Sequence, residues 1–428
     1  MKSDSGPVCK KKPFDFSHRL TKQQWSWALY DFANSSFSTV ILTFVYSLYF
    51  AKAIVGDPIT GTALWSYAIA TSGFFVAILA PIFGAAADHY GVPKRFLRIF
   101  ALTCIIATAL LWWGPIFATL PQILVIMLIL AVANLGLELS LVFYNAMLPH
   151  IVEPENIGRV SGKAWALGYL GGLISLLLVF VLFVGIGKME PLLQFQRHEA
   201  EHIRASALFV ALWYMIFLIP ILIWCPDAPR TGLKFKEAVK RGLRELRQSF
   251  STAKHNRNLL LFVIASAIYR DGLVTLFAIG GLYAAGTFSM SFYEIMLFGI
   301  MMNLAAGIGA FVLSSSDDIF GSKTTVLVSL VGLIIFGGAT LFIDSKTTFM
   351  MVASFMALFI GPVQAASRTM ISRLAPRETL NQSYGIYAFT GKSIAFLGPL
   401  LFGLATTAFE SQRAGMSIIL GFWVIGFI

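Results

Sequence analysis

Long apolar segments, each about as long as a membrane-crossing helix, follow one another along almost the whole of this 428-residue chain. A helix needs about 20 apolar residues to cross the hydrocarbon core of a bilayer. Only 12% of the residues are charged, whereas soluble domains carry about 25%. We therefore predict an all-α membrane protein with about twelve transmembrane helices. The apolar segments lie at 25–52, 62–86, 96–116, 121–148, 160–187, 204–225, 258–285, 292–314, 324–343, 347–371, 383–408 and 414–428.

The basic residues are distributed unevenly between the connections that join these segments. If the N-terminus is placed inside, most of the 32 Lys and Arg residues fall in the inner connections. The positive-inside rule then predicts that both termini are cytoplasmic. The net charge of +11 is explained by topology and by contact with lipid headgroups, so we expect no nucleic-acid partner.

A basic polar stretch divides the chain into two sets of six segments. Lys or Arg recurs at near-helical spacing from Lys234 to Lys254, with apolar residues between. This pattern is typical of an amphipathic helix on the inner leaflet, and a solvated tether is the alternative. The predicted organisation is a basic cytoplasmic tail at 1–23, a six-helix bundle at 24–226, a basic linker at 227–257 and a second six-helix bundle at 258–428.

Three weak sequence matches relate the two halves, all in order and at an offset of six helices. Two like-oriented halves related by an axis along the membrane normal are the architecture of the major facilitator superfamily, whose substrate site lies between the halves near mid-membrane. The matches pair Ala28–Asp31 with Ala267–Asp271, Asp88–Gly91 and Lys94 with Asp318–Gly321 and Lys323, and Pro154, Gly162 and Gly168 with Pro376, Gly385 and Gly391.

The connection between the second and third segments resembles the signature loop of that superfamily. Its carboxylate can interact with the positive end of a neighbouring helix, and its glycine permits a tight turn. The resemblance implies gating rather than substrate binding, although His89 and Val92 replace the usual basic residues. An ordinary charged cytoplasmic turn is the alternative. The candidate gating residues are Gly84, Asp88, Gly91, Lys94 and Asp318.

A few charged side chains lie inside the apolar segments, where charge is costly and therefore indicates function. Most fall on the first, fourth, seventh and tenth helices, which line the cavity in this architecture. They can form internal ion pairs, for example Arg270 with Glu138, or bind the two charges of a zwitterion, or carry protons. The candidate substrate-binding residues are Asp31, Asn34, Glu138, Tyr144, Arg270, Asp271, Gln364 and Lys392. Arg368 adds a further hydrogen-bonding group to the same helices.

Several other patterns have structural interpretations. Thr21 with Gln24, and Ser291 with Glu294, have the spacing of a capping box at a helix start. The small residues from Gly168 to Gly172 predict close helix packing. The three cysteines show no metal-ligand or disulfide spacing, and no P-loop or hydrolase motif occurs. We therefore expect no enzyme activity, cofactor or metal.

Two longer stretches of the sequence are more specific, Trp27–Phe37 and Phe143–Gly172. They resemble one branch of the superfamily, the autophagy-related permeases that include the fungal vacuolar amino-acid effluxer. Tyr269–Gly272 fits that branch's pattern in the seventh helix except at Arg270. The resemblance implies export of amino acids by alternating access, with proton coupling left open. Another cargo, such as a sugar, nucleoside, organic anion or drug, is the alternative, and a non-transporting receptor is a further one. We expect a monomer in a bacterial inner membrane, with a small-molecule substrate and lipid contacts.

Overall fold

The computed structural model describes residues 20–90, 93–152, 157–185, 190–227, 232–253, 256–375 and 380–428. These ranges contain helices, turns and irregular connections and no strand. The first half contains α1 (Lys22–Ser36), η1 (Phe37–Phe44), α2 (Tyr46–Tyr49), η2 (Phe50–Ile54), α3 (Pro58–Tyr90), α4 (Pro93–Leu110), η3 (Leu111–Trp113), α5 (Leu120–Ile151), α6 (Ile157–Val179), η5 (Phe180–Val184) and α7 (Glu201–Trp224). The remainder contains α8 (Phe235–Ala253), α9 (Arg257–Thr287), α10 (Phe292–Phe320), α11 (Ser322–Thr340), α12 (Lys346–Ala357), α13 (Ile360–Leu374), α14 (Leu380–Ile394), α15 (Leu397–Ala408) and α16 (Gln412–Phe427).

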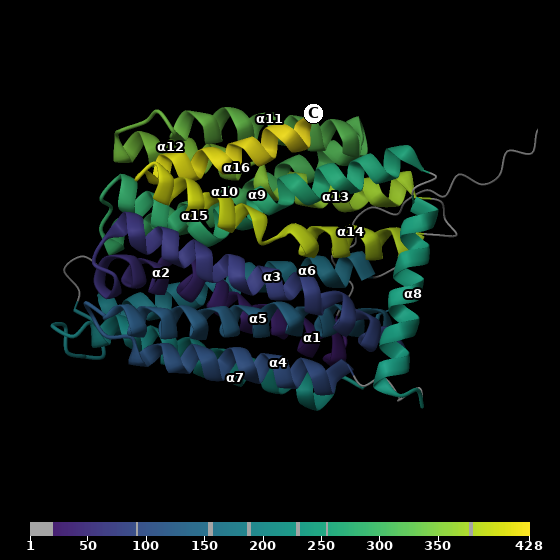
Figure 1. The fold of residues 1–428 in the computed structure, drawn as a ribbon, viewed down its shortest axis with the longest axis horizontal. Coiled ribbons are helices and arrows are strands. Elements are labelled where there is room, and N and C mark those ends of the chain that lie inside the picture. The colour runs from purple at the N-terminus through teal and green to yellow at the C-terminus, as the bar shows by residue number, and fades with distance from the viewer. Residues whose placement is uncertain are drawn as a thin grey trace, which may run out of the picture.

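The long helices run side by side along one axis, and α8 crosses one end of them (Figure 1). Ten stretches of the described residues are long and apolar enough to cross a membrane, and two shorter apolar helices accompany them at Tyr293–Gly309 and Gln412–Phe427. Several stretches join successive elements. The first includes α1, η1, α2 and η2, and the tenth joins α14 to α15 across an interruption at residues 395–396. The predicted all-α, membrane-spanning architecture is confirmed.

Helix starts confirm the two capping boxes read from the sequence. The backbone N–H of Thr21 donates to Gln24 Oε1 at 3.1 Å, and the Gln24 N–H donates back to Thr21 Oγ1 at 3.3 Å. Ser291 and Glu294 exchange the same two bonds at the start of α10, at 2.7 and 3.3 Å. Each box satisfies backbone donors that the first helical turn leaves free.

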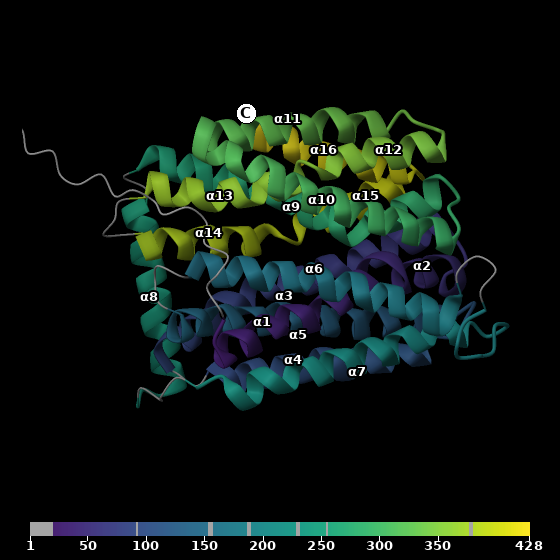
Figure 2. The ribbon, with the colours of Figure 1, turned by 180° about the vertical axis from the view of Figure 1, so that it is seen from behind.

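The two halves of the chain form two separate blocks of helices, drawn in purple to blue and in green to yellow in Figures 1 and 2. The internal repeat is visible in their contacts. Tyr30 on α1 hydrogen bonds to Ser140 on α5 at 2.6 Å, and Tyr269 on α9 forms the equivalent bond to Ser367 on α13 at 2.6 Å. The same tyrosine–serine bond therefore joins the first helix to the fourth helix in each half, which confirms two six-helix bundles related by pseudo-symmetry.

Glycines of the repeat also occupy equivalent places. A β-carbon at Gly168 on α6 would lie 3.4 Å from Asp31 Cβ, and one at Gly391 on α14 would lie 2.9 Å from the Arg270 guanidinium. At Gly171 it would lie 2.4 Å from the Phe32 carbonyl oxygen. The small residues between Gly168 and Gly172 therefore allow α6 to pack closely on α1, as predicted.

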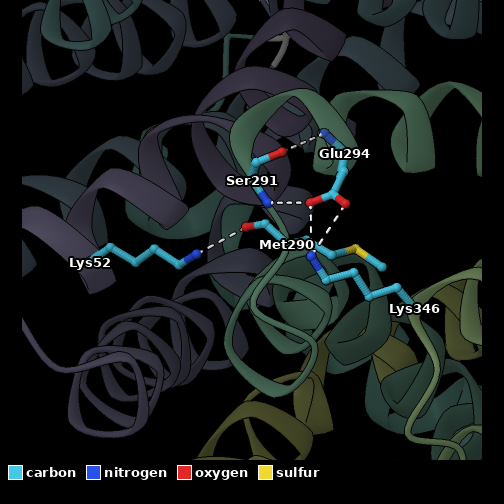
Figure 3. Close-up of polar contacts among 5 residues, drawn as sticks. All are labelled: Lys52, Met290, Ser291, Glu294 and Lys346. Atoms are coloured by element: carbon cyan, nitrogen blue, oxygen red, sulfur yellow. Dashed lines mark hydrogen bonds and ion pairs between the residues drawn. The ribbon is translucent and has the colours of Figure 1, made fainter.

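At the end opposite α8, here called the far end, side chains tie the two halves together. Lys52 on η2 donates to the Met290 carbonyl at 3.0 Å, across the boundary between the halves (Figure 3). Glu294 accepts from Lys346 at 3.2 Å beside this contact (Figure 3). Thr43 Oγ1 donates to the Phe277 carbonyl at 2.9 Å. The bonds of Lys52 and Thr43 therefore join the two halves at the far end.

A glycine at the same boundary permits a close approach of the two halves. A β-carbon at Gly281 would lie only 2.2 Å from the Thr43 carbonyl oxygen. The glycine is therefore required for the close approach of α9 to η1. Thr43 lies in a π-helical segment, and π-helical turns are frequent at functional sites.

The helix predicted in the basic linker is present as α8. Its first residue, Phe235, lies among the rings of Phe83, Tyr90 and Phe96 of the first half, with ring centroids 5.8 to 6.4 Å apart. Its other end reaches the second half, where α8 contacts α14 (Figures 1 and 2). The helix thus lies across one end of both bundles and rests on protein through its first turn.

Candidate functional site

Asp31 on α1 lies in a cluster of polar and aromatic side chains in the first half. The Tyr144 hydroxyl donates to Asp31 Oδ2 at 2.9 Å, and Asn34 Nδ2 lies 3.4 Å from Oδ1. The Tyr144 ring stacks on Trp27 with centroids 4.3 Å apart. These contacts join three of the predicted substrate-binding residues, Asp31, Asn34 and Tyr144. Because these two donors are neutral, they orient the carboxylate without cancelling its charge.

A second layer of hydroxyl groups fixes this cluster to its neighbours. The Tyr30 hydroxyl lies 2.6 Å from Ser140 Oγ and 2.8 Å from the Tyr214 hydroxyl. The Tyr30 ring also packs against Tyr144, with centroids 4.8 Å apart. Since all three partners are buried, the network holds α1, α5 and α7 in one relative position.

Arg270 on α9 occupies the position in the second half that Asp31 occupies in the first, because each follows the tyrosine of the repeated bond. Its guanidinium lies 4.2 Å from the centre of the Tyr387 ring and donates to the Tyr387 carbonyl at 3.2 Å. The two pseudo-equivalent positions thus carry opposite charges. The example of an Arg270–Glu138 ion pair is wrong, because Arg270 is directed to α14 and Glu138 has another partner.

That partner is Lys392, and the ion pair crosses the boundary between the halves. Lys392 Nζ on α14 donates to Glu138 Oε2 on α5. The two side chains keep 38% and 27% of their exposure, so the pair is only partly buried. An internal ion pair was one of the predicted roles of these charges, and the structure brings together two of the predicted residues in this way.

Arg368 on α13 is a site residue that the candidate substrate-binding set omits. Its exposed guanidinium lies over the ring of Trp165 on α6, 5.2 Å from the centroid, so it also crosses between the halves. The sequence contains one signal for Arg368. It directly follows Ser367, and Ser367 is equivalent in the repeat to Ser140 of the first half.

Asp271 lies apart from these groups, inside the second half. It is 1% exposed, and its Oδ2 accepts the Gly398 backbone N–H at 2.8 Å. Gln364, also predicted to bind substrate, is half-buried on α13. Glu138 and Lys392 therefore meet across the boundary, whereas Asp31, Asn34 and Tyr144 cluster within the first half and Asp271 lies inside the second.

The structure describes only some of the predicted gating residues. Lys94 Nζ donates to the Cys225 carbonyl at 2.7 Å, and its backbone N–H donates to Asp227 at 3.2 Å. These bonds attach the loop to the end of α7. Gly84 lies on α3 with Val142 as its neighbour at an ordinary distance of 3.8 Å from a built β-carbon. Gly91 and the side chains of Asp88 and Asp318 lie outside the described residues.

Comparison with known proteins places these features in a family. The family model of vacuole effluxer Atg22-like proteins matches residues 51–159 and 153–428. The chain belongs to this family. It is 28% identical to the MFS-type transporter YxiO of Bacillus subtilis (strain 168), over 96% of this chain and 94% of that protein. It is 23% identical to autophagy-related protein 22 of Yarrowia lipolytica, over 61% of this chain and 48% of the fungal protein.

Solved structures of major facilitator transporters share the fold. A point mutant of the nucleoside transporter NupG superposes with a TM-score of 0.67 at 12% identity, covering 95% of this chain and 97% of NupG. The inward-open xylose transporter XylE from E. coli superposes with a TM-score of 0.66 at 13% identity, covering 94% of this chain and 93% of XylE. This member of the Atg22-like family is therefore a multi-pass membrane transporter of the major facilitator type, and not an enzyme.

Proposed function

We propose that this transporter exports amino acids, or similar small zwitterions, by alternating access. The observation that carries the proposal is the division of charge at the boundary. The first half contributes the carboxylates of Asp31 and Glu138, and the second contributes the cations of Arg368 and Lys392. A ligand that carries an anion and a cation on one small skeleton can contact both halves at once.

The surroundings of Asp31 and Arg368 fit the two ends of such a ligand. An ammonium group can bind the Asp31 carboxylate beside the ring of Tyr144, since aromatic faces attract cations. A carboxylate can bind the planar guanidinium of Arg368 with two parallel hydrogen bonds. Desolvation makes both pairings necessary, because a charge buried without its partner costs several kcal/mol.

The contacts at the two ends support a cycle in which the far end is closed in this structure. Under the positive-inside rule, the end covered by the basic helix α8 is cytoplasmic. We propose that substrate enters there and that rocking of the halves breaks the far-end bonds of Lys52 and Thr43 to release it outside. The relationship to YxiO along nearly the full length supports a bacterial cytoplasmic membrane as the location.

Counterflow in proteoliposomes, with a panel of radiolabelled amino acids, tests this proposal. We expect saturable exchange of at least one of them, and a loss of at least tenfold in the D31N and R368Q variants. R413Q is the matched control, since Arg413 pairs with Asp344 at the far end and should exchange like the wild type. Exchange of a sugar or nucleoside but of no amino acid, or full exchange by D31N and R368Q, would overturn the assignment.

A further inference from the structure

The helix formed by α14 and α15 corresponds to the eleventh apolar segment of the sequence and is called the eleventh helix here. Its interruption lies beside the buried carboxyl group of Asp271. Helix α14 ends at Ile394 and α15 begins at Leu397, so backbone N–H groups at the start of α15 lack a partner in the preceding turn. One of them, the N–H of Gly398, donates to Asp271 Oδ2 at 2.8 Å. The carboxyl group on α9 therefore caps the second part of a broken helix.

The other carboxyl oxygen has no such partner. Asp271 Oδ1 is fully buried and has no hydrogen-bond partner among the described residues. It is directed at the same helix start, because a β-carbon at Gly398 would lie 2.9 Å from it and 2.1 Å from Thr275 Oγ1. The Thr275 hydroxyl donates to the Asp271 backbone carbonyl at 2.8 Å and not to the carboxyl group.

Within the described part of the chain, the charged groups on the surrounding elements are engaged elsewhere. Arg270 donates a hydrogen bond to the Tyr387 carbonyl on α14, and Lys392 on α14 pairs with Glu138. Helix α15 contains no ionisable residue. Further ionisable groups on packed elements include Arg413 on α16, which pairs with Asp344, Arg368 on α13, which lies over Trp165, and Tyr67 on α3, which bonds to Thr407.

An ionised carboxylate in this place would be a buried charge with one hydrogen bond and no partner of opposite sign among the described residues, which costs several kcal/mol. A neutral acid avoids that cost and still accepts the Gly398 N–H. We infer that Asp271 is a proton-binding site, neutral while the far end is closed, and that it couples proton movement to the position of the two parts of the eleventh helix.

The connection to transport rests on the function proposed above. Lys392, which forms the ion pair between the halves, lies less than one turn before the interruption. A movement of α14 relative to α15 would both alter the Lys392–Glu138 ion pair and admit water to Asp271. The proton would then leave Oδ1 for the solution on the side to which the site opens, and a proton from the other side would replace it.

Infrared spectroscopy of purified protein tests the bound proton without any substrate. A protonated carboxyl group has a C=O absorption separate from that of a carboxylate. We expect D271N to lose one such band at neutral pH, and G398A to shift the band by crowding Oδ1. D57N is the control, because hydrogen bonds from Thr60 lower the pKa of Asp57 and keep it ionised. Identical spectra for wild type and D271N would overturn the inference.

Transport measurements test the coupling. We expect accumulation driven by a pH gradient to fall to equilibration in D271N, whereas T275V, which keeps the carboxyl group, should retain it. D271N that still accumulates substrate, or T275V that does not, would overturn the coupling. If the wild type exchanges no amino acid, the proposed function fails, and the infrared spectra still decide whether Asp271 holds a proton.

Discussion

Removal of the ion pair between Glu138 and Lys392 tests whether the halves are held together electrostatically at the boundary. Two unit charges at 4 Å attract by about 4 kcal/mol at an effective dielectric constant of 20, and desolvation and side-chain ordering offset much of this. Exposed pairs contribute roughly 0.2–1 kcal/mol, whereas breaking a buried pair costs roughly 3–5 kcal/mol. With 38% and 27% of the side chains exposed, we expect a coupling energy of about 1–2 kcal/mol.

The assay is a double-mutant cycle on the stability of the purified transporter. E138Q and K392M should each lower the thermal midpoint, and the double variant should lose less than the two changes added together. The charge-swapped E138K/K392E protein should recover part of the loss. Arg241 and Glu245 on α8 provide the control, because they are 63% and 51% exposed and an i,i+4 pair of this kind contributes about 0.3–0.5 kcal/mol. Additive effects within about 0.3 kcal/mol would refute the reasoning.

Two further predictions concern packing and the closed far end. G171A should destabilise the protein by about 1–3 kcal/mol, because the new β-carbon would lie 2.4 Å from a backbone oxygen of α1; thermal unfolding measures this, and G421A, which meets nothing within 4 Å, should not be destabilised. K52M should remove the bond to the Met290 carbonyl and raise hydrogen exchange in residues 37–54 severalfold, whereas K346M, which acts within the second half, should leave that segment unchanged. Unchanged exchange in K52M would contradict the gating role of this bond.

The sequence was sufficient for the features that depend on composition, spacing and local chemistry. The length of the apolar segments predicted the membrane-spanning helices. The spacing of the capping residues predicted where α1 and α10 begin, and the weak internal repeat predicted the two bundles. The cost of burying charge selected Asp31 before any contact was known. The small residues Gly168 and Gly171 likewise predicted close packing against another helix, without indicating which helix that is.

The pairing of the charges could not be obtained in this way. A helix that is apolar on all sides gives no periodic signal of which face meets its neighbour. Arg270 could therefore be assigned to the cavity although it turns to Tyr387, and Lys392 could not be matched to Glu138 on a helix of the other half. The interruption before Leu397 has a local signal in Gly398 and Pro399, because proline lacks the backbone N–H that would bond to the carbonyl four residues earlier. That signal does not indicate that Asp271 lies beside the interruption.

The contrast between the repeated and unrepeated contacts supports the proposed substrate site between the halves. The bonds of Tyr30 and Tyr269 place Asp31 and Arg270 at equivalent points of the two halves. If these two groups met, they would neutralise each other and leave little attraction for a solute. Instead Arg270 is held by Tyr387, within its own half, and the side-chain donors to Asp31, Tyr144 and Asn34, are neutral. Under the proposed function, the ammonium group of a substrate supplies the cation that pairs with Asp31, and Arg368 binds the substrate carboxylate from the second half.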